Sequence, residues 1–136
     1  MAEQRPDRVR GPAHDDFWAW CDQGELRLQR CGSCKRVSWP VAPACEYCAS
    51  PLLTFEPMSG RAKLVSWCVF ERDYYAGKLP VPWETILVEL EEGAMFVSNP
   101  ESFTWKDARV GMALKVAFRD CEDSGGPFRL PVFAPA

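Results

Sequence analysis

Four cysteines within eighteen residues constrain the fold of this chain more than any other feature. Two C-x2-C pairs, separated by ten residues, place these thiols at Cys31, Cys34, Cys45 and Cys48. Each C-x2-C turn directs two sulfurs toward one point, and two such turns complete the tetrahedral thiolate shell that zinc prefers. A thioredoxin-like redox pair would explain one turn but not two, and no βαβ pattern surrounds either turn. The spacing therefore predicts a zinc ribbon that holds one Zn2+.

The predicted zinc site is structural rather than catalytic. Four thiolates saturate a tetrahedral ion and leave no position for water or substrate, whereas catalytic zinc keeps such a position. Cys21, Cys68 and Cys121 lie outside the pattern. We expect them to be small buried residues, with Cys68 directed into or against the predicted barrel.

The cysteine content agrees with a reducing compartment. The N-terminus MAEQRPDRVRGPAHDD is polar and lacks the apolar stretch of a secretory signal. No apolar run approaches the roughly 20 residues that cross a bilayer. We therefore expect a cytoplasmic protein without membrane association, in which the seven cysteines have a reason other than disulfides, most commonly a metal.

The sequence predicts a mainly β chain in three parts. Residues 1–13 are polar and indicate a flexible tail, residues 14–52 hold a short helix and the ribbon, and residues 53–136 form a β domain. The helix is expected to be N-capped by Asp15 or Asp16. Strands are expected at 61–71, 84–93, 94–99, 114–120 and in a last strand, RLPVFAPA, that prolines limit, with a tight turn at 91–93. Four or five strands, with one long excursion between the first two, favour a small closed barrel over a sandwich.

Aromatic side chains mark two candidate binding regions. Phe17 and Trp18 lie on an apolar helix face that is expected to dock on a partner. The long loop 72–83 is the second region, because exposed aromatics beside basic groups can stack an adenine, pair its phosphates or anchor a protein. Trp67 and Phe70, which precede this loop, are expected in the barrel core. The candidate binding residues of the loop are Arg72, Tyr74, Tyr75, Lys78 and Trp83.

No group of residues indicates catalysis by the chain alone. His14 is the only histidine and lies beside the predicted tail, which argues against a His-dependent triad. The glycine-rich segment 124–127 lacks the Lys and hydroxyl residue of a phosphate loop and indicates a turn. A net charge of −3 argues against a protein that tracks a phosphate backbone. We therefore expect no activity of the isolated chain and no nucleic-acid partner.

The order of these segments resembles the zinc-ribbon/OB-fold acyl-CoA-associated protein family. The resemblance runs from about Phe17 to Pro135 and rests most on FW…GELRLQRC, SGRAKLVSW and RVGMALKVAF. It implies a rubredoxin-like zinc ribbon followed by a small OB-fold barrel. Matched residue by residue, the family's zinc ligands fall on the four cysteines of the two C-x2-C pairs, all of which this sequence keeps.

The resemblance also implies a function. Members of the family are typically accessory subunits that bind thiolase-fold enzymes or MaoC-like hydratases and help to bind the CoA thioester. We accordingly expect a hetero-oligomer with a thiolase-fold enzyme and acyl-CoA as a ligand, and thiolysis, aldol cleavage and condensation all remain open as the partner's reaction. The alternative hypotheses are a single-stranded nucleic-acid-binding zinc-ribbon/OB module and a redox protein that uses the C-x2-C pairs.

Overall fold

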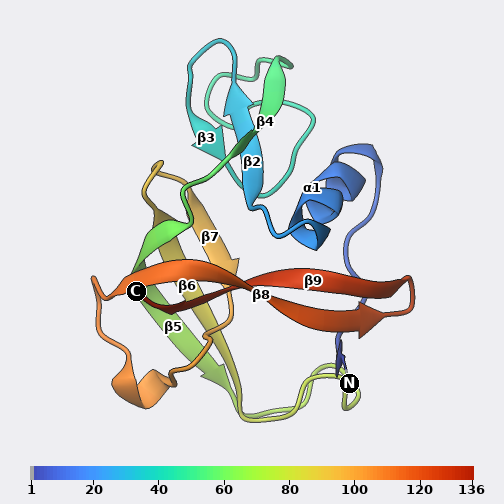
Figure 1. Cartoon of the computed structure of the whole chain (residues 1–136), viewed down its shortest axis with the longest axis vertical. Coiled ribbons are helices and arrows are strands. Elements are labelled where there is room, and N and C mark those ends of the chain that lie inside the picture. Colours follow the sequence, from blue (N-terminus) through green and yellow to red (C-terminus); the bar gives the residue numbers. More distant parts are fainter. Residues whose placement is uncertain (1) are drawn as a thin grey trace.

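The computed structural model describes residues 2–136 (Figure 1). The described strands form a three-stranded sheet and a six-stranded sheet. No helix in this part of the chain is long and apolar enough to cross a membrane. The elements, in chain order, are β1 (Glu3–Gln4), α1 (Pro12–Asp22), β2 (Arg27–Cys31), β3 (Val37–Ser38), β4 (Leu53–Pro57), β5 (Arg61–Phe70), β6 (Trp83–Leu90), β7 (Met95–Ser98), the short 3-10 helix η1 (Trp105–Asp107), β8 (Ala113–Asp123) and β9 (Gly126–Pro135).

The three-stranded sheet forms the ribbon. β2 lies in its middle and pairs antiparallel with β3 and with β4. Figure 1 shows this ribbon at one end of the molecule, with α1 beside it and the larger sheet below. The boundary predicted after residue 52 falls at the start of β4. Because β4 pairs with β2, it continues the ribbon sheet before the chain enters the larger sheet.

The six-stranded sheet closes into a small barrel, as the sequence predicted. Its order is β1-β8-β5-β6-β7, with β9 paired to β8. β7 and β9 meet where the N–H of Phe133 donates to the carbonyl oxygen of Asn99 (3.2 Å). Nearby, the Ser98 hydroxyl donates to the carbonyl oxygen of Pro131 (2.9 Å). The long β8–β9 hairpin extends past the barrel, and α1 packs on β9 (Figure 1).

One hydrophobic core joins the helix, the ribbon and the barrel. Alternate side chains of β5, β6 and β7 point inward, as expected for strands with one buried face. Because residues of all three parts belong to a single buried cluster, the ribbon and the barrel are held together by shared packing. The buried members of the cluster are Phe17, Cys21, Leu26, Leu28, Val37, Ala62, Leu64, Ile86, Val88, Leu90, Ala94, Phe96, Leu114 and Phe133.

The N-terminal segment is packed on the barrel, which corrects the expectation of a flexible tail over residues 1–13. Met1 lies outside the described residues. β1 pairs in parallel with β8, and Arg8 forms a buried ion pair with Asp123, with Nε and Oδ2 2.7 Å apart. These partners lie more than a hundred residues away in the sequence, so no local pattern reveals them.

The helix begins earlier than predicted. α1 starts at Pro12, directly after Gly11, instead of after a cap at Asp15 or Asp16. Proline suits the first turn of a helix because its missing N–H has no intrahelical acceptor there. The predicted capping residues therefore lie inside the helix.

A β-bulge in β5 corrects two expectations about buried residues. The register with β6 shifts between Leu64 and Ser66, and an extra residue in a strand exchanges the faces of the side chains that follow it. Cys68 and Phe70 are consequently exposed, although the sequence predicted that both would pack in or against the barrel. Trp67 packs against the core as predicted.

The last strand is longer than predicted. β9 pairs with β8 along its whole length, although it contains three prolines. The N–H groups of alternate residues point to the same side of a strand, and the N–H of Phe133 points away from β8, toward Asn99. Pro127, Pro131 and Pro135 each lie an even number of residues from Phe133, so their nitrogen atoms also point away from β8. The absence of an N–H at these prolines therefore removes no hydrogen bond to β8.

The predicted turns agree with the structure. Residues 91–94 connect β6 to β7 and include the turn expected at 91–93. Of the turn expected at 124–127, Ser124 and Gly125 connect β8 to β9, and the other two residues begin β9. The long loop between β5 and β6 spans residues 71–82.

Candidate metal centre and ligand cavity

The four predicted zinc ligands come together in the ribbon. The Sγ atoms of Cys31 and Cys48 are 3.5 Å apart, those of Cys34 and Cys45 are 3.6 Å apart, and all four lie within 4.8 Å of one another. Thiolates about 2.3 Å from a tetrahedral zinc ion would be about 3.8 Å apart, whereas a disulfide would bring two sulfurs to about 2.0 Å. The cluster therefore fits one metal ion and no disulfide.

The two C-x2-C turns share one backbone geometry. The N–H of Lys35 donates to the carbonyl oxygen of Cys31 (3.0 Å), and that of Ala49 donates to Cys45 (2.9 Å). Lys35 and Ala49 both have positive φ, 68° and 63°. The N–H of Cys34 donates to Sγ of Cys31 and, with a second N–H of the same turn, lowers the pKa of that thiol to about 6. The first turn thus favours the thiolate of Cys31, and four thiolates would close the shell around zinc as in a structural site.

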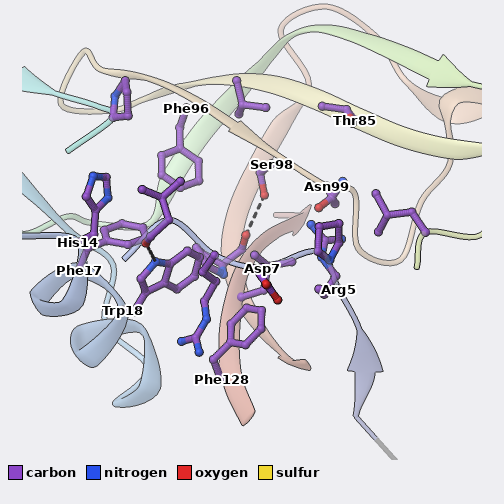
Figure 2. Close-up of a pocket in the computed structure, with 18 of the residues that line it drawn as sticks. Arg5, Asp7, His14, Phe17, Trp18, Thr85, Phe96, Ser98, Asn99 and Phe128 are labelled. Atoms are coloured by element: carbon purple, nitrogen blue, oxygen red, sulfur yellow. Dashed lines mark hydrogen bonds between the residues drawn. The ribbon is translucent and has the colours of Figure 1, made fainter. Parts of the chain in front are cut away.

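A cavity of about 670 Å³ lies between the N-terminal segment, α1, the ribbon and the barrel (Figure 2). Its volume is within the range of small-molecule sites, roughly 300–1,000 Å³. The wall is mainly apolar and includes Trp18 of α1, Trp39 of the ribbon, Phe96 of β7 and Phe128 of β9. Because these side chains come from distant parts of the sequence, the cavity is formed only by the folded chain.

The structure brings most of the predicted binding residues to this region. The predicted residues that line the cavity are Phe17, Trp18, Tyr75 and Trp83. Arg72 and Tyr74 line a small neighbouring depression, and Lys78 lines neither. Phe17 is only 5% exposed and belongs to the core. The expectation that the apolar helix face docks on a partner is therefore wrong for Phe17, since that face packs against this protein itself.

Sequence reasoning missed several residues of the cavity. Arg5 was assigned to a tail, Asn99 to the end of the strand expected at 94–99, and Phe128 to the residues that follow a turn, although all three line the cavity. The alternation of β7 could have identified Phe96 as an inward-facing residue. No local signal identifies Arg5, because only the packing of the N-terminal segment places it there.

Arg5 is the less satisfied of the two arginines that line the cavity. Its Nη1 atom is buried without a hydrogen-bond partner among the described residues, and it lies 3.8 Å from a carboxylate oxygen of Glu3. The guanidinium stands 4.8 Å from the ring centre of Trp83, within the range of a cation–π contact. Burial lowers the pKa of this guanidinium from its ordinary value.

Arg8 is held by an ion pair with Asp123 and by two aromatic rings. Its guanidinium lies 4.1 Å from the ring centre of Phe128 and 5.5 Å from that of Trp18. It donates to both carboxylate oxygens of Asp123. These hydrogen bonds lower the pKa of the Asp123 carboxyl to about 2, so the pair is ionised at neutral pH.

The cysteines outside the ribbon are poor nucleophiles or lie away from the cavity. Burial raises the pKa of the Cys21 thiol to about 12 and that of the Cys121 thiol to about 11. The thiolate is the reactive form, so both groups are inert at neutral pH. Within residues 2–136, no cysteine lines the cavity, and its only histidine is His14.

Comparison with known proteins agrees with this two-part architecture. The family model of the ChsH2 rubredoxin-like zinc ribbon domain matches residues 18–54, and that of the ChsH2 C-terminal OB-fold domain matches residues 55–119. A solved structure named Ltp2-ChsH2(DUF35) aldolase is 25% identical with a TM-score of 0.79, over 95% of this chain and 98% of that chain. A DUF35 protein of unknown function from Sulfolobus solfataricus shares the fold, with 21% identity and a TM-score of 0.60 over 78% of each chain.

A longer relative extends the comparison. A probable enoyl-CoA hydratase alpha subunit from Thermomonospora curvata is 29% identical over 141 residues, which include all of this chain and 43% of the relative. The chain thus spans less than half the length of that protein. The two matched family models, the four-cysteine centre and the closed barrel show that the chain belongs to the ChsH2-type family, in which a rubredoxin-like zinc ribbon precedes an OB-fold domain.

Proposed function

We propose that this chain is a non-catalytic accessory subunit of an acyl-CoA-processing complex. In this proposal it binds a thiolase-fold enzyme, either a thiolase or a retro-aldolase, and helps that enzyme to bind a CoA thioester. The observation that carries the proposal is the nearly end-to-end similarity to a ChsH2 chain whose solved structure is named for an aldolase. The similarity to a hydratase subunit named for enoyl-CoA supports the thioester as the ligand class.

The chemistry of the chain supports an accessory role. A four-thiolate centre leaves a zinc ion no open position, and the two buried thiols outside it are protonated at neutral pH. The large cavity lacks a nucleophile paired with a base among the residues that line it. A partner would therefore supply the reacting groups, and this chain would supply binding surface.

The loop between β5 and β6 is the docking surface that we favour. Phe70, Tyr74, Tyr75 and Val81 are all exposed large apolar residues at or within this loop, and Tyr74 is 64% exposed. Aromatic residues of this kind are enriched at protein interfaces. The docking surface thus lies on the rim of the cavity, where a partner could reach a ligand that the cavity holds.

Co-purification tests the proposal. A tagged copy of this chain, expressed in its native host, should retain a thiolase-fold enzyme, and the purified complex should turn over an acyl-CoA thioester while the isolated chain does not. Tyr74→Ser should weaken retention, whereas Trp105→Ser, which changes an exposed aromatic on η1 outside the loop, should not. Robust thioester turnover by the isolated chain, or retention of no thiolase-fold enzyme, would rule the proposal out.

A further inference from the structure

The cavity has a mainly apolar body, with His14 beside Phe17 on one side and a polar end at Arg5 and Asn99 on the other. In Figure 2 the aromatic side chains Trp18 and Phe96 lie toward one side, and Arg5 and Asn99 lie toward the other. The guanidinium of Arg5 stands over Trp83. The Asn99 amide donates to the carbonyl oxygen of the residue that follows Trp83 (2.8 Å). The polar end is therefore built around the start of β6.

Arg5 brings unused hydrogen-bonding capacity to this polar end. Nη1 is buried and has no hydrogen-bond partner among the described residues, and the Glu3 carboxylate at 3.8 Å is beyond hydrogen-bond length. A buried donor without a partner is unfavourable. An acceptor oxygen placed beside Nη1 would remove this penalty, which the apolar walls alone cannot do.

The charge balance of the cavity restricts what can bind. Glu3 stands close to Arg5, Asp123 neutralises Arg8, and Asp7 adds a carboxylate to the lining. The nucleotide of CoA carries several phosphate charges and would need a surplus of cationic groups. The cavity offers no such surplus, but it suits an apolar compound that presents a single acceptor oxygen.

We infer that the cavity binds an apolar carbonyl or carboxylate compound, with the ligand oxygen accepting a hydrogen bond from Nη1 of Arg5, and that it excludes the CoA nucleotide. The identification of this ligand with the acyl part of a thioester rests on the proposed function. The binding of an apolar carbonyl or carboxylate compound by the isolated chain does not depend on that function. In the complex, the apolar acyl group would enter the cavity and the nucleotide would stay outside it.

Titration of the full chain with dodecanoate tests this inference. One dodecanoate per chain should bind saturably and change the tryptophan fluorescence, since Trp18, Trp39 and Trp83 all line the cavity. CoA without an acyl group should not displace it. Arg5→Met, which keeps an apolar stem but removes the donors, should weaken binding at least fivefold. The matched change Arg109→Met, at an exposed arginine that does not line the cavity, should leave binding unchanged.

A second pair of variants tests the location of the ligand. Val97 and Met95 lie two residues apart on β7 and are 46% and 44% exposed, but only Val97 lines the cavity. Val97→Trp should fill the cavity and abolish dodecanoate binding, and Met95→Trp should not. Absence of saturable binding, equal binding by the two tryptophan variants, or displacement by CoA would overturn the inference. Dodecanoate binding by a chain that retains no thiolase-fold enzyme would overturn only the proposed function.

Discussion

Arg8 and Asp123 are joined by three hydrogen bonds although 115 positions separate them in the sequence. Nε and the backbone N–H of Arg8 donate to Oδ2 of Asp123 at 2.7 and 3.0 Å, and Nη2 donates to Oδ1 at 3.2 Å. The two side chains are only 6% and 3% exposed. This pair fastens the N-terminal segment to the β8–β9 hairpin and so fixes one wall of the cavity.

Removing one member of this pair should destabilise the fold. Arg8→Met leaves the Asp123 carboxylate buried without its cation, and the loss of one partner of a buried ion pair costs roughly 3 kcal/mol. Urea denaturation should show this decrease in the free energy of unfolding. Arg10→Met is the matched control, because Arg10 pairs with Asp15 at an exposed position and should change stability by less than about 1 kcal/mol. Equal effects of the two variants would contradict the structural role of Arg8.

The same pair predicts an acid dependence of stability. The pKa of the Asp123 carboxyl is lowered from 3.8 to about 2 by the Arg8 hydrogen bonds, so the unfolded chain binds a proton at higher pH than the folded chain does. Its contribution, on the order of 2 kcal/mol, is fully present above about pH 5 and is lost as the pH falls through 4 toward 2. Urea denaturation at several pH values should show that the free energy of unfolding depends less steeply on pH over this window in Asp123→Asn than in the unmodified chain. An unchanged pH dependence would contradict the lowered pKa.

The parts of the fold that could be predicted depend on short-range patterns. The two C-x2-C turns, the turn at residues 91–93 and the alternating strands are each encoded by residues close together in the sequence. The clustering of the four cysteines could therefore be predicted, because all four belong to one eighteen-residue segment.

The parts that could not be predicted depend on contacts between distant residues. Arg5 enters the cavity only because β1 pairs with β8, and this parallel pairing of a two-residue strand leaves no periodic signal. The exposure of Cys68 and Phe70 follows from a bulge two to four residues earlier, which alternation alone does not reveal. The aromatics Tyr75 and Trp83, which the sequence singles out as binding candidates, do line the cavity, and their role in binding stays a prediction.

The close approach of Val116 to Gly60 predicts that a side chain at position 60 would destabilise the fold. Gly60 has φ of +85°, and a Cβ atom there would lie 2.7 Å from Cγ1 of Val116. Its carbonyl oxygen also accepts from the N–H of Val116 (2.8 Å), so the backbone cannot move away without loss of that bond. Gly60→Ala should lower the free energy of unfolding by roughly 1–3 kcal/mol, because alanine is strained at this φ and meets a β-branched side chain.

Gly93→Ala is the matched control for Gly60. Gly93 also has a positive φ, +99°, but nothing lies within 4 Å of the position of its Cβ. The difference between the two variants in thermal or urea unfolding measures the steric part of the effect. An equal loss of stability in both variants would show that the backbone conformation alone limits these positions.

Loss of the metal should unfold more than the ribbon. Binding of structural zinc contributes about 10–16 kcal/mol in small zinc-finger peptides, which is comparable to the whole stability of a typical domain, about 5–15 kcal/mol. Leu28 and Val37 of the ribbon belong to the same buried cluster as the barrel residues, so a disordered ribbon would expose part of the barrel core. Cys34→Ser should therefore lose the one zinc ion per chain, lower the melting temperature sharply and dissociate any complex. Elemental analysis and circular dichroism measure the first two effects.

Cys68→Ser provides the control for this substitution. Cys68 is an exposed cysteine outside the metal centre, so its replacement should leave the zinc content, the melting temperature and complex formation unchanged. A Cys34→Ser chain that kept its fold and its partner but lost the activity of the complex would make the centre catalytic and would contradict the closed four-thiolate shell. The distinction is sharp because a saturated zinc ion can act on the reaction only through the structure that it holds together.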